Sequence, residues 1–145
     1  MKIITCLDKN NGMSFHGKRQ SRDEMVIKDI VNFISENNYK LIMNENSYRL
    51  FLKYNSEIND MKSNFICYED SEELYDDVDY CFVETFNIEK IKDEIKELII
   101  YRWDKVYPST IKFDVSCTTL NLFKTDEIIG RSHEKIIREV YRKND

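Results

Sequence analysis

The chain has 145 residues, of which 41% are hydrophobic and 34% are charged, and its formal net charge is −5. This length and composition predict one globular domain that spans residues 1–145. The acidic balance argues against non-specific DNA binding, because such binding needs a basic surface. No apolar run has the length of a membrane helix or of a signal peptide, so we expect a cytoplasmic protein with no membrane partner.

The four cysteines lie far apart in the sequence and form no Cys-x-x-Cys motif. Three of the four lie in apolar, strand-like stretches, and neither histidine stands at ligand spacing from a cysteine. We interpret them as small core residues in a reducing compartment. We therefore expect no disulfide framework and no metal site.

The first half of the chain predicts strands alternating with helices. A buried strand over residues 2–7 precedes a helix over 22–36, where apolar residues recur at helical spacing. A strand over 40–43, a helix over 47–54 and a strand over 64–68 follow. An acidic helical turn is expected from Ser71, and then a strand over 80–83.

In the second half, Asn87 is a good N-cap for a helix that carries Ile88, Ile91, Ile95 and Leu98 at intervals of three and four. Strands are expected over 98–103, 110–115 and 119–123. Residues 133–142 fit a helix face better than a strand edge, and both interpretations stay open. The element order predicts a single α/β domain with a mostly parallel sheet flanked by helices and antiparallel late strands.

The loop between the first strand and the first helix carries a dense set of polar side chains. Asn11-Gly12 indicates a tight turn, and Ser21 with Glu24 three residues later is a capping-box pattern. Ligands of open α/β sheets bind at the carboxyl ends of the strands, where this loop should lie. We predict there a crevice for a small anionic or nucleotide-like ligand. The predicted ligand-binding residues are Asn11, Arg19, Gln20, Asp23 and Arg102.

The segment 69–79 is strongly acidic, and its simplest interpretation is a solvated helix or loop. An alternative is a docking surface for a basic protein partner. The chain would then be an acidic antagonist, an immunity or anti-defence inhibitor of a toxin, nuclease or defence enzyme. The predicted partner-binding residues are Glu69, Asp70, Asp76, Asp77 and Asp79.

A catalytic interpretation rests on few residues. Ser132, His133 and Glu134 are adjacent, and these residue types can form an acid–base pair with a nucleophile. The capping pattern favours a helix that starts there, with Ser132 as its N-cap and Glu134 in its first turn. Asp23 is either a general acid or ligand acceptor, or a carboxylate that stabilises the first turn of its helix. The candidates for an enzyme are Asp23, His133 and Glu134.

The element order, together with three local stretches, resembles dihydrofolate reductase over most of the chain. The stretches are residues 3–13, 22–25 and 40–48. This resemblance implies the fold of that family, and it implies that Asp23 matches the carboxylate that holds the pterin.

Two departures from that family concern its cofactor. Residues 83–87 stand where the family has a Gly-Gly pair, and Glu45 stands where it has an arginine near the cofactor phosphate. Side chains block the approach that glycine permits, and Glu84 would repel a phosphate. We therefore expect no NADPH and no other cofactor. The favoured function is binding without redox chemistry, and a divergent reductase or hydrolase is a further alternative.

The opening of the chain is also similar to a small uncharacterised family of low-GC Gram-positive bacteria. The shared segments include Arg19-Gln20-Ser21 and Ser132-His133-Glu134-Lys135. Some of its members carry the label ribonuclease Z. That enzyme needs a cluster of metal-binding histidines, whereas this chain has only His16 and His133.

Overall fold

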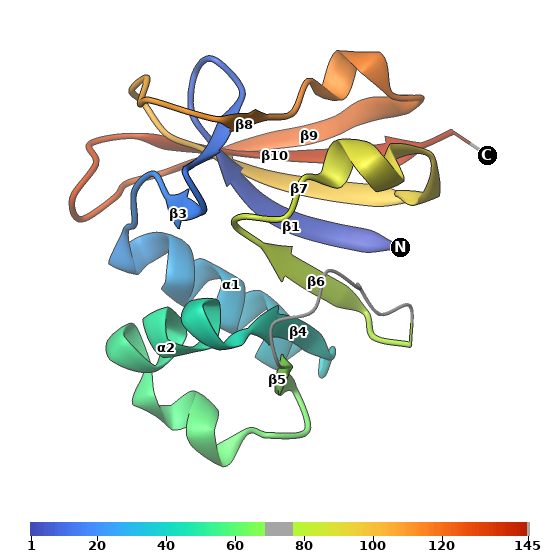
Figure 1. Ribbon diagram of the computed structural model, residues 1–145. Coiled ribbons are helices and arrows are strands. Elements are labelled where there is room, and N and C mark those ends of the chain that lie inside the picture. The colour runs from blue at the N-terminus through green and yellow to red at the C-terminus, as the bar shows by residue number, and fades with distance from the viewer. Residues whose placement is uncertain (69–76, 145) are drawn as a thin grey trace.

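The computed structural model describes residues 1–68 and 77–144 (Figure 1). Its main sheet has seven strands in the order β5-β4-β6-β1-β7-β10-β9. These strands are β1 (Lys2–Leu7), β4 (Leu41–Asn44), β5 (Phe65–Tyr68), β6 (Tyr80–Val83), β7 (Glu97–Arg102), β9 (Leu120–Ile128) and β10 (Ile136–Lys143). A second sheet has the order β3-β2-β8. Its strands are β2 (Gly12–Phe15), β3 (Lys18–Arg19) and β8 (Ile111–Lys112).

The five strands from β5 to β7 run parallel, with β1 between β6 and β7. β10 is antiparallel to β7, and β9 is antiparallel to β10. The expected α/β sheet with antiparallel late strands is confirmed.

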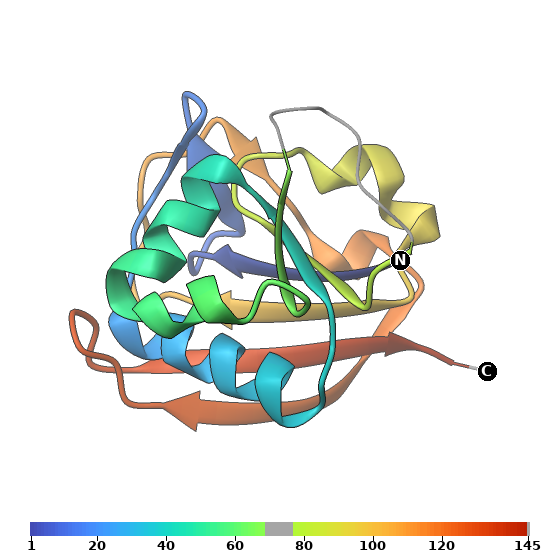
Figure 2. The same cartoon turned by 90° about the horizontal axis from the view of Figure 1, so that it is seen from below.

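Among the described residues there are two α-helices, α1 (Glu24–Glu36) and α2 (Glu45–Tyr54), and they cover one face of the main sheet (Figure 2). The buried stripe of α1, from Val26 to Ile34, lies in one core cluster with Ile4, Phe51 and Ile99. Alternation along β1 sends Ile4 to this face and Ile3 to the other. The stripe seen in the sequence is therefore the core-facing side of α1.

The other face of the sheet is covered by short elements. These are the second sheet and the 3-10 helices η2 (Ile88–Glu94) and η3 (Val115–Cys117). A further 3-10 helix, η1 (Ser56–Asp60), follows α2 and does not belong to this cover. Ile3, Leu98 and Ile100 pack here with Met13 and Phe113. Loop 8–23, which contains β2 and β3, thus contributes to the second core cluster.

The structure corrects the expected helix after Asn87. Asn87 does cap a helix, but this is the short, kinked η2, and it ends before Ile95. Ile95 and Leu98 are buried beyond that helix, and Leu98 belongs to β7. The regular spacing therefore belonged to two successive elements that pack into the same core.

Residues 133–142 do not form the helix that their periodicity favoured. They contain β10, which pairs with β7 on one side and β9 on the other. Ile136 and Val140 are buried, in keeping with period-two burial. Hydrogen bonds from two neighbouring strands outweigh a weak helical pattern, and no helix begins at Ser132.

Smaller differences concern element ends and cysteines. The N-cap of α1 is Asp23, and Ser21 does not cap it. The strand expected over 110–115 is only β8, and the turn expected from Ser71 lies outside the described residues. Cys81 is buried as expected, but Cys67 and Cys117 are exposed. Within residues 1–68 and 77–144, no helix is long and apolar enough to cross a membrane.

Candidate functional site

Loop 8–23 is organised around the buried carboxylate of Asp8, which is 0% exposed. It accepts hydrogen bonds from the main-chain N–H groups of Asn10 and Gly12, both at 2.8 Å. It also accepts from the Gln20 side chain and from the main chain of Tyr107, both at 3.0 Å. Asp8 thus joins the loop to the segment after β7, and it holds the predicted ligand contact Gln20.

Arg19 lies at the carboxyl end of β6, where it binds Glu84. Its Nε and Nη2 atoms donate to the two carboxylate oxygens at 2.8 and 2.9 Å. Ser47 donates to the same carboxylate at 2.7 Å. Glu84 is only 8% exposed, so its charge is compensated within the protein. A ligand in the predicted crevice would have to compete with Glu84 for Arg19.

Arg102 and Asn11 also bind each other. Arg102 donates from Nη1 to Asn11 Oδ1 at 2.8 Å and to the Asp8 carbonyl at 3.1 Å. Its Nε and Nη2 atoms donate to Glu139 at 3.2 and 2.9 Å. The structure therefore joins Asn11, Gln20 and Arg102 in one hydrogen-bonded network around Asp8, whereas Arg19 belongs to a separate group with Glu84.

The carboxylate of Asp23 is 1% exposed and serves two segments. It caps α1 through Met25 N–H, and it accepts from the main-chain N–H groups of Arg131, Ser132 and His133 at 2.8 to 3.0 Å. Burial alone would raise the pKa of Asp23, but these main-chain hydrogen bonds lower it to about 2. Asp23 is therefore ionised at neutral pH.

His133 is 4% exposed, and its ring stacks on Trp103 with centroids 4.4 Å apart. Its Nδ1 atom lies 3.3 Å from Asp23 Oδ2. Glu134, by contrast, is exposed. The structure thus pairs His133 with Asp23 and does not bring Glu134 to it.

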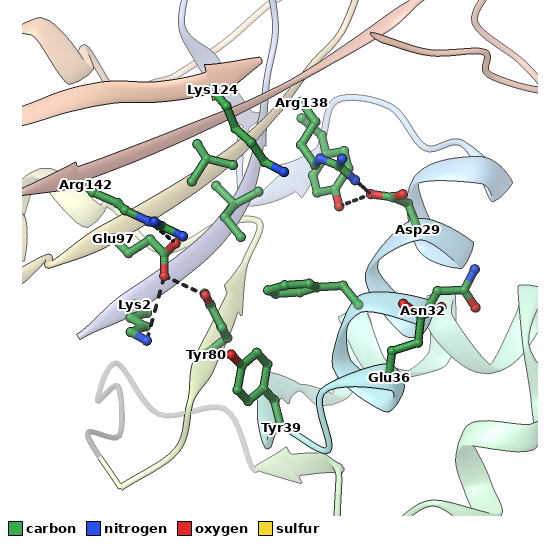
Figure 3. Close-up of a pocket in the computed structure, with 14 residues that line it drawn as sticks. Lys2, Asp29, Asn32, Glu36, Tyr39, Tyr80, Glu97, Lys124, Arg138 and Arg142 are labelled. Carbon is green, nitrogen blue, oxygen red and sulfur yellow. Dashed lines mark hydrogen bonds and ion pairs between the residues drawn. The ribbon is translucent and has the colours of Figure 1, made fainter. Parts of the chain in front are cut away.

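The structure also contains a pocket of about 480 Å³ on the α1 side of the main sheet (Figure 3). It lies between α1 and the strands β7, β9 and β10, with Lys2 and Tyr80 at one end. One wall is aromatic, since Phe33, Tyr39 and Tyr80 have ring centroids 5.4 to 5.7 Å apart. This pocket shares no lining residue with the predicted crevice contacts.

The opposite wall of the pocket is cationic. Arg138 binds Asp29 and Asp126, and Arg142 binds Glu97 at 3.1 Å. Lys124 reaches toward the pocket beside Arg138, and its ammonium group is 3.7 Å from Asp126 (Figure 3). The cations of this wall are therefore paired with carboxylates, since Arg138 and Lys124 share Asp126 and Arg138 also binds Asp29.

Glu97 lies at one end of the pocket, where it receives a 2.6 Å hydrogen bond from the Tyr80 hydroxyl. Burial, and then the contact with Glu97, raise the pKa of Tyr80, so its hydroxyl stays protonated. Lys2 approaches the same carboxylate at 3.8 Å. This end of the pocket is thus a hydrogen-bonded framework around Glu97.

Most of the predicted acidic docking surface lies outside the described residues, including Glu69, Asp70 and Asp76. Asp77 is exposed, and Asp79 accepts a hydrogen bond from Lys40 N–H at 2.7 Å. The partner prediction therefore stays a prediction. In the part of the chain that is described, no group of three His, Cys, Asp or Glu side chains could hold a metal ion.

The structure of dihydrofolate reductase from Enterococcus faecalis, complexed with NADP(H) and RAB-propyl, aligns with this chain at a TM-score of 0.56. The alignment covers 99% of this chain and 96% of the reductase, with 11% sequence identity. This chain has a dihydrofolate-reductase-like fold. No protein-family model and no curated protein sequence matches it. At this identity, the likeness to the reductase shows the fold and leaves the activity open.

Within the dihydrofolate-reductase-like fold, sequence reasoning missed Asp8 and the pocket. Asp8 had a readable signal, because an Asp before Asn10-Asn11-Gly12 is typical of a turn in which the side chain binds main-chain N–H groups. The pocket had no such signal in the sequence, because its lining residues come from α1, from Tyr39 and from five strands of the main sheet. Their convergence depends on the strand order.

Proposed function

We propose that this protein binds a small anionic, nucleotide-like ligand without redox chemistry, in the pocket between α1 and strands β7, β9 and β10. The observation that carries the proposal is the pairing of an aromatic wall with a cationic wall in one hollow of about 480 Å³. Pockets for small molecules commonly have volumes of roughly 300 to 1,000 Å³. The volume is therefore suitable for a ligand of this class.

The two arginines of the cationic wall have N–H groups that their carboxylate partners do not use. Arg138 donates to its carboxylates from Nη1 and Nη2, and Arg142 donates to Glu97 from Nε. A guanidinium group has five N–H donors, so both arginines retain N–H groups for a phosphate or carboxylate. Lys124 is 54% exposed and only loosely paired, so it can turn to an incoming anion.

The aromatic wall supports a planar ligand group. Tyr39 and Phe33 are partly exposed, and Phe33 packs edge to face with both Tyr39 and Tyr80. A flat heterocycle can pack on such rings while an anionic group faces Lys124. A nucleotide-like molecule combines these two features.

The predicted crevice at loop 8–23 is the second position for such a ligand. There, Arg19 and Arg102 are each bound by a carboxylate, and Gln20 is bound by Asp8. Binding would need these contacts to break, which costs free energy. In the pocket, Arg138 and Arg142 are also bound by carboxylates, but Lys124 lies 3.7 Å from Asp126 and is 54% exposed, so it can turn to an anion. We therefore favour the pocket.

The test is a thermal-shift screen of the full chain against nucleoside mono- and diphosphates, cyclic nucleotides, folates and NADPH. Specific binding raises the unfolding temperature. Lys124→Glu should weaken binding of the active compound at least tenfold. Lys135→Glu is the matched control, because Lys135 has similar exposure, 56%, and does not line the pocket.

Binding in the crevice and binding in the pocket predict different outcomes of this test. If Arg19→Ala abolishes binding and Lys124→Glu does not, the ligand occupies the crevice and the pocket proposal is wrong. If no compound raises the unfolding temperature, the proposed ligand class is wrong.

A further inference from the structure

We propose that Ser21, His133 and Asp23 form a hydrolytic triad in which Ser21 attacks the acyl carbon of a small ester. The Ser21 hydroxyl lies 3.0 Å from His133 Nε2. On the other side of the ring, Nδ1 lies 3.3 Å from Asp23 Oδ2. A nucleophile, a base and a carboxylate thus stand in the order that activates a serine.

The surroundings of the ring select the required tautomer. Nδ1 lies 3.1 Å from the Ser132 hydroxyl, which donates to Asp23 or to the Arg22 carbonyl, and 3.3 Å from the ionised Asp23 carboxylate. A proton on Nδ1 is favoured, because a lone pair there would face a negative charge. Nε2 is then the acceptor nitrogen, and it faces Ser21. Asp23 is a positioning residue in this arrangement, and His133 is the base.

The triad is held rigidly. The Asp23 carboxylate is bound by consecutive main-chain N–H groups from Arg131 to His133, and the His133 ring stacks on Trp103. Gly130 allows this loop to approach, since a Cβ there would lie 2.2 Å from the His133 carbonyl oxygen and 2.7 Å from Asp23 Oδ2. Such preorganisation is what a catalytic group needs.

The triad also has an open side. His133 and Asp23 are buried, whereas Ser21 is partly exposed and the neighbouring Arg22 is exposed. Among the described residues, the main-chain N–H groups of Ser21 and Arg22 make no hydrogen bond. These donors are available for the negative charge that develops on a carbonyl oxygen during attack.

The reaction uses only the substrate and water. Ser21 Oγ bonds to the acyl carbon as its proton passes to His133 Nε2. The ester C–O bond breaks, and the leaving oxygen takes that proton. Water then gives a proton to Nε2 and bonds to the acyl carbon, and Ser21 Oγ leaves with the proton.

Tyr107 lowers the reactivity of Ser21 in this arrangement. Its hydroxyl lies 2.9 Å from His133 Nε2, so it competes with Ser21 for the single lone pair. Removing the Tyr107 hydroxyl should leave Nε2 to Ser21 alone. Tyr107→Phe is therefore expected to increase the reactivity of Ser21 several-fold, which a purely structural role of the histidine would not produce.

The experiment treats the full chain with a fluorophosphonate probe, which forms a P–O bond to an activated serine and releases fluoride. Peptide mass spectrometry should locate the label on Ser21, and p-nitrophenyl acetate should be hydrolysed. Ser21→Ala should abolish both signals, and His133→Gln should reduce them at least tenfold. Ser116→Ala is the matched control, because the Ser116 hydroxyl binds a carboxylate, Asp114, and no histidine.

Circular dichroism of each variant checks that it is folded. The proposal is overturned if the folded wild-type chain takes no label, if Ser21→Ala labels as fast, or if His133→Gln and Tyr107→Phe leave the rate unchanged. Labelling needs no nucleotide, so this result is independent of the proposed pocket ligand.

Discussion

Arg19 and Glu84 bind each other through two hydrogen bonds of 2.8 and 2.9 Å, which fasten loop 8–23 to the carboxyl end of β6. Glu84 is only 8% exposed, and its remaining side-chain partner is Ser47. From its order in the sequence, Glu84 stands where the resemblance to dihydrofolate reductase implies a cofactor phosphate.

The Arg19–Glu84 pair should be important for stability. Arg19→Ala leaves a buried carboxylate without its cation, and we expect a loss of about 3 kcal/mol in the free energy of unfolding. Arg49→Ala is the control, because the Arg49–Glu45 pair is 68% and 67% exposed. Its loss should be about 0.5 kcal/mol or less. Urea denaturation measures both, and equal losses would contradict a structural role for Arg19.

Asp23 should contribute stability that acid removes. Its pKa is about 2 in the folded chain, below the model-compound value of 3.8, so the unfolded chain binds the proton more tightly. The contribution is present above about pH 4 and is lost as the pH falls toward 2. A depression of this size corresponds to about 2 kcal/mol. The control is Asp60→Asn, because the Asp60 carboxylate is exposed. Between pH 6 and pH 2, the urea concentration at the unfolding midpoint should fall less steeply for Asp23→Asn than for this control.

Gly130 should not tolerate a side chain. The Cβ of an alanine would collide with the His133 carbonyl oxygen, so the loop that binds Asp23 would have to move. We expect Gly130→Ala to cost about 2 kcal/mol. Ile129→Ala changes the adjacent residue, which is 79% exposed, and should cost little. Thermal unfolding measures the stability of both variants. If Gly130→Ala left the unfolding temperature unchanged, the loop would adapt without strain and this prediction would be wrong.

Two leucines test the assignment of the core. Leu50 on α2 is 5% exposed, whereas Leu122 on β9 is 55% exposed. Leu50→Ala should therefore reduce the free energy of unfolding by about 2–4 kcal/mol, because it removes buried contacts and leaves a cavity. Leu122→Ala should change it by about 0.5 kcal/mol. Denaturation curves measure both losses, and a larger loss for Leu122→Ala than for Leu50→Ala would contradict the described core.

Local patterns in the sequence determined much of the fold. The helix expected over 22–36 corresponds to α1 because its apolar stripe is the face that packs on the sheet. The strands expected over 2–7 and 80–83 are β1 and β6, whose residues are buried on both faces of a parallel sheet. Composition and element order were sufficient for the α/β class, since burial periodicity is a property of the chain itself.

Only the tertiary structure decided β10 and the sites. Residues 136–143 form a strand because β7 and β9 supply hydrogen bonds on both sides, and a sequence pattern contains no information about those neighbours. Asp23 was expected at the start of a helix, but its contacts with His133 join positions 110 residues apart. The pocket likewise exists because the strand order places Lys124, Arg138 and Tyr80 around α1. Such contacts arise from packing between distant segments, so the tertiary structure alone revealed them.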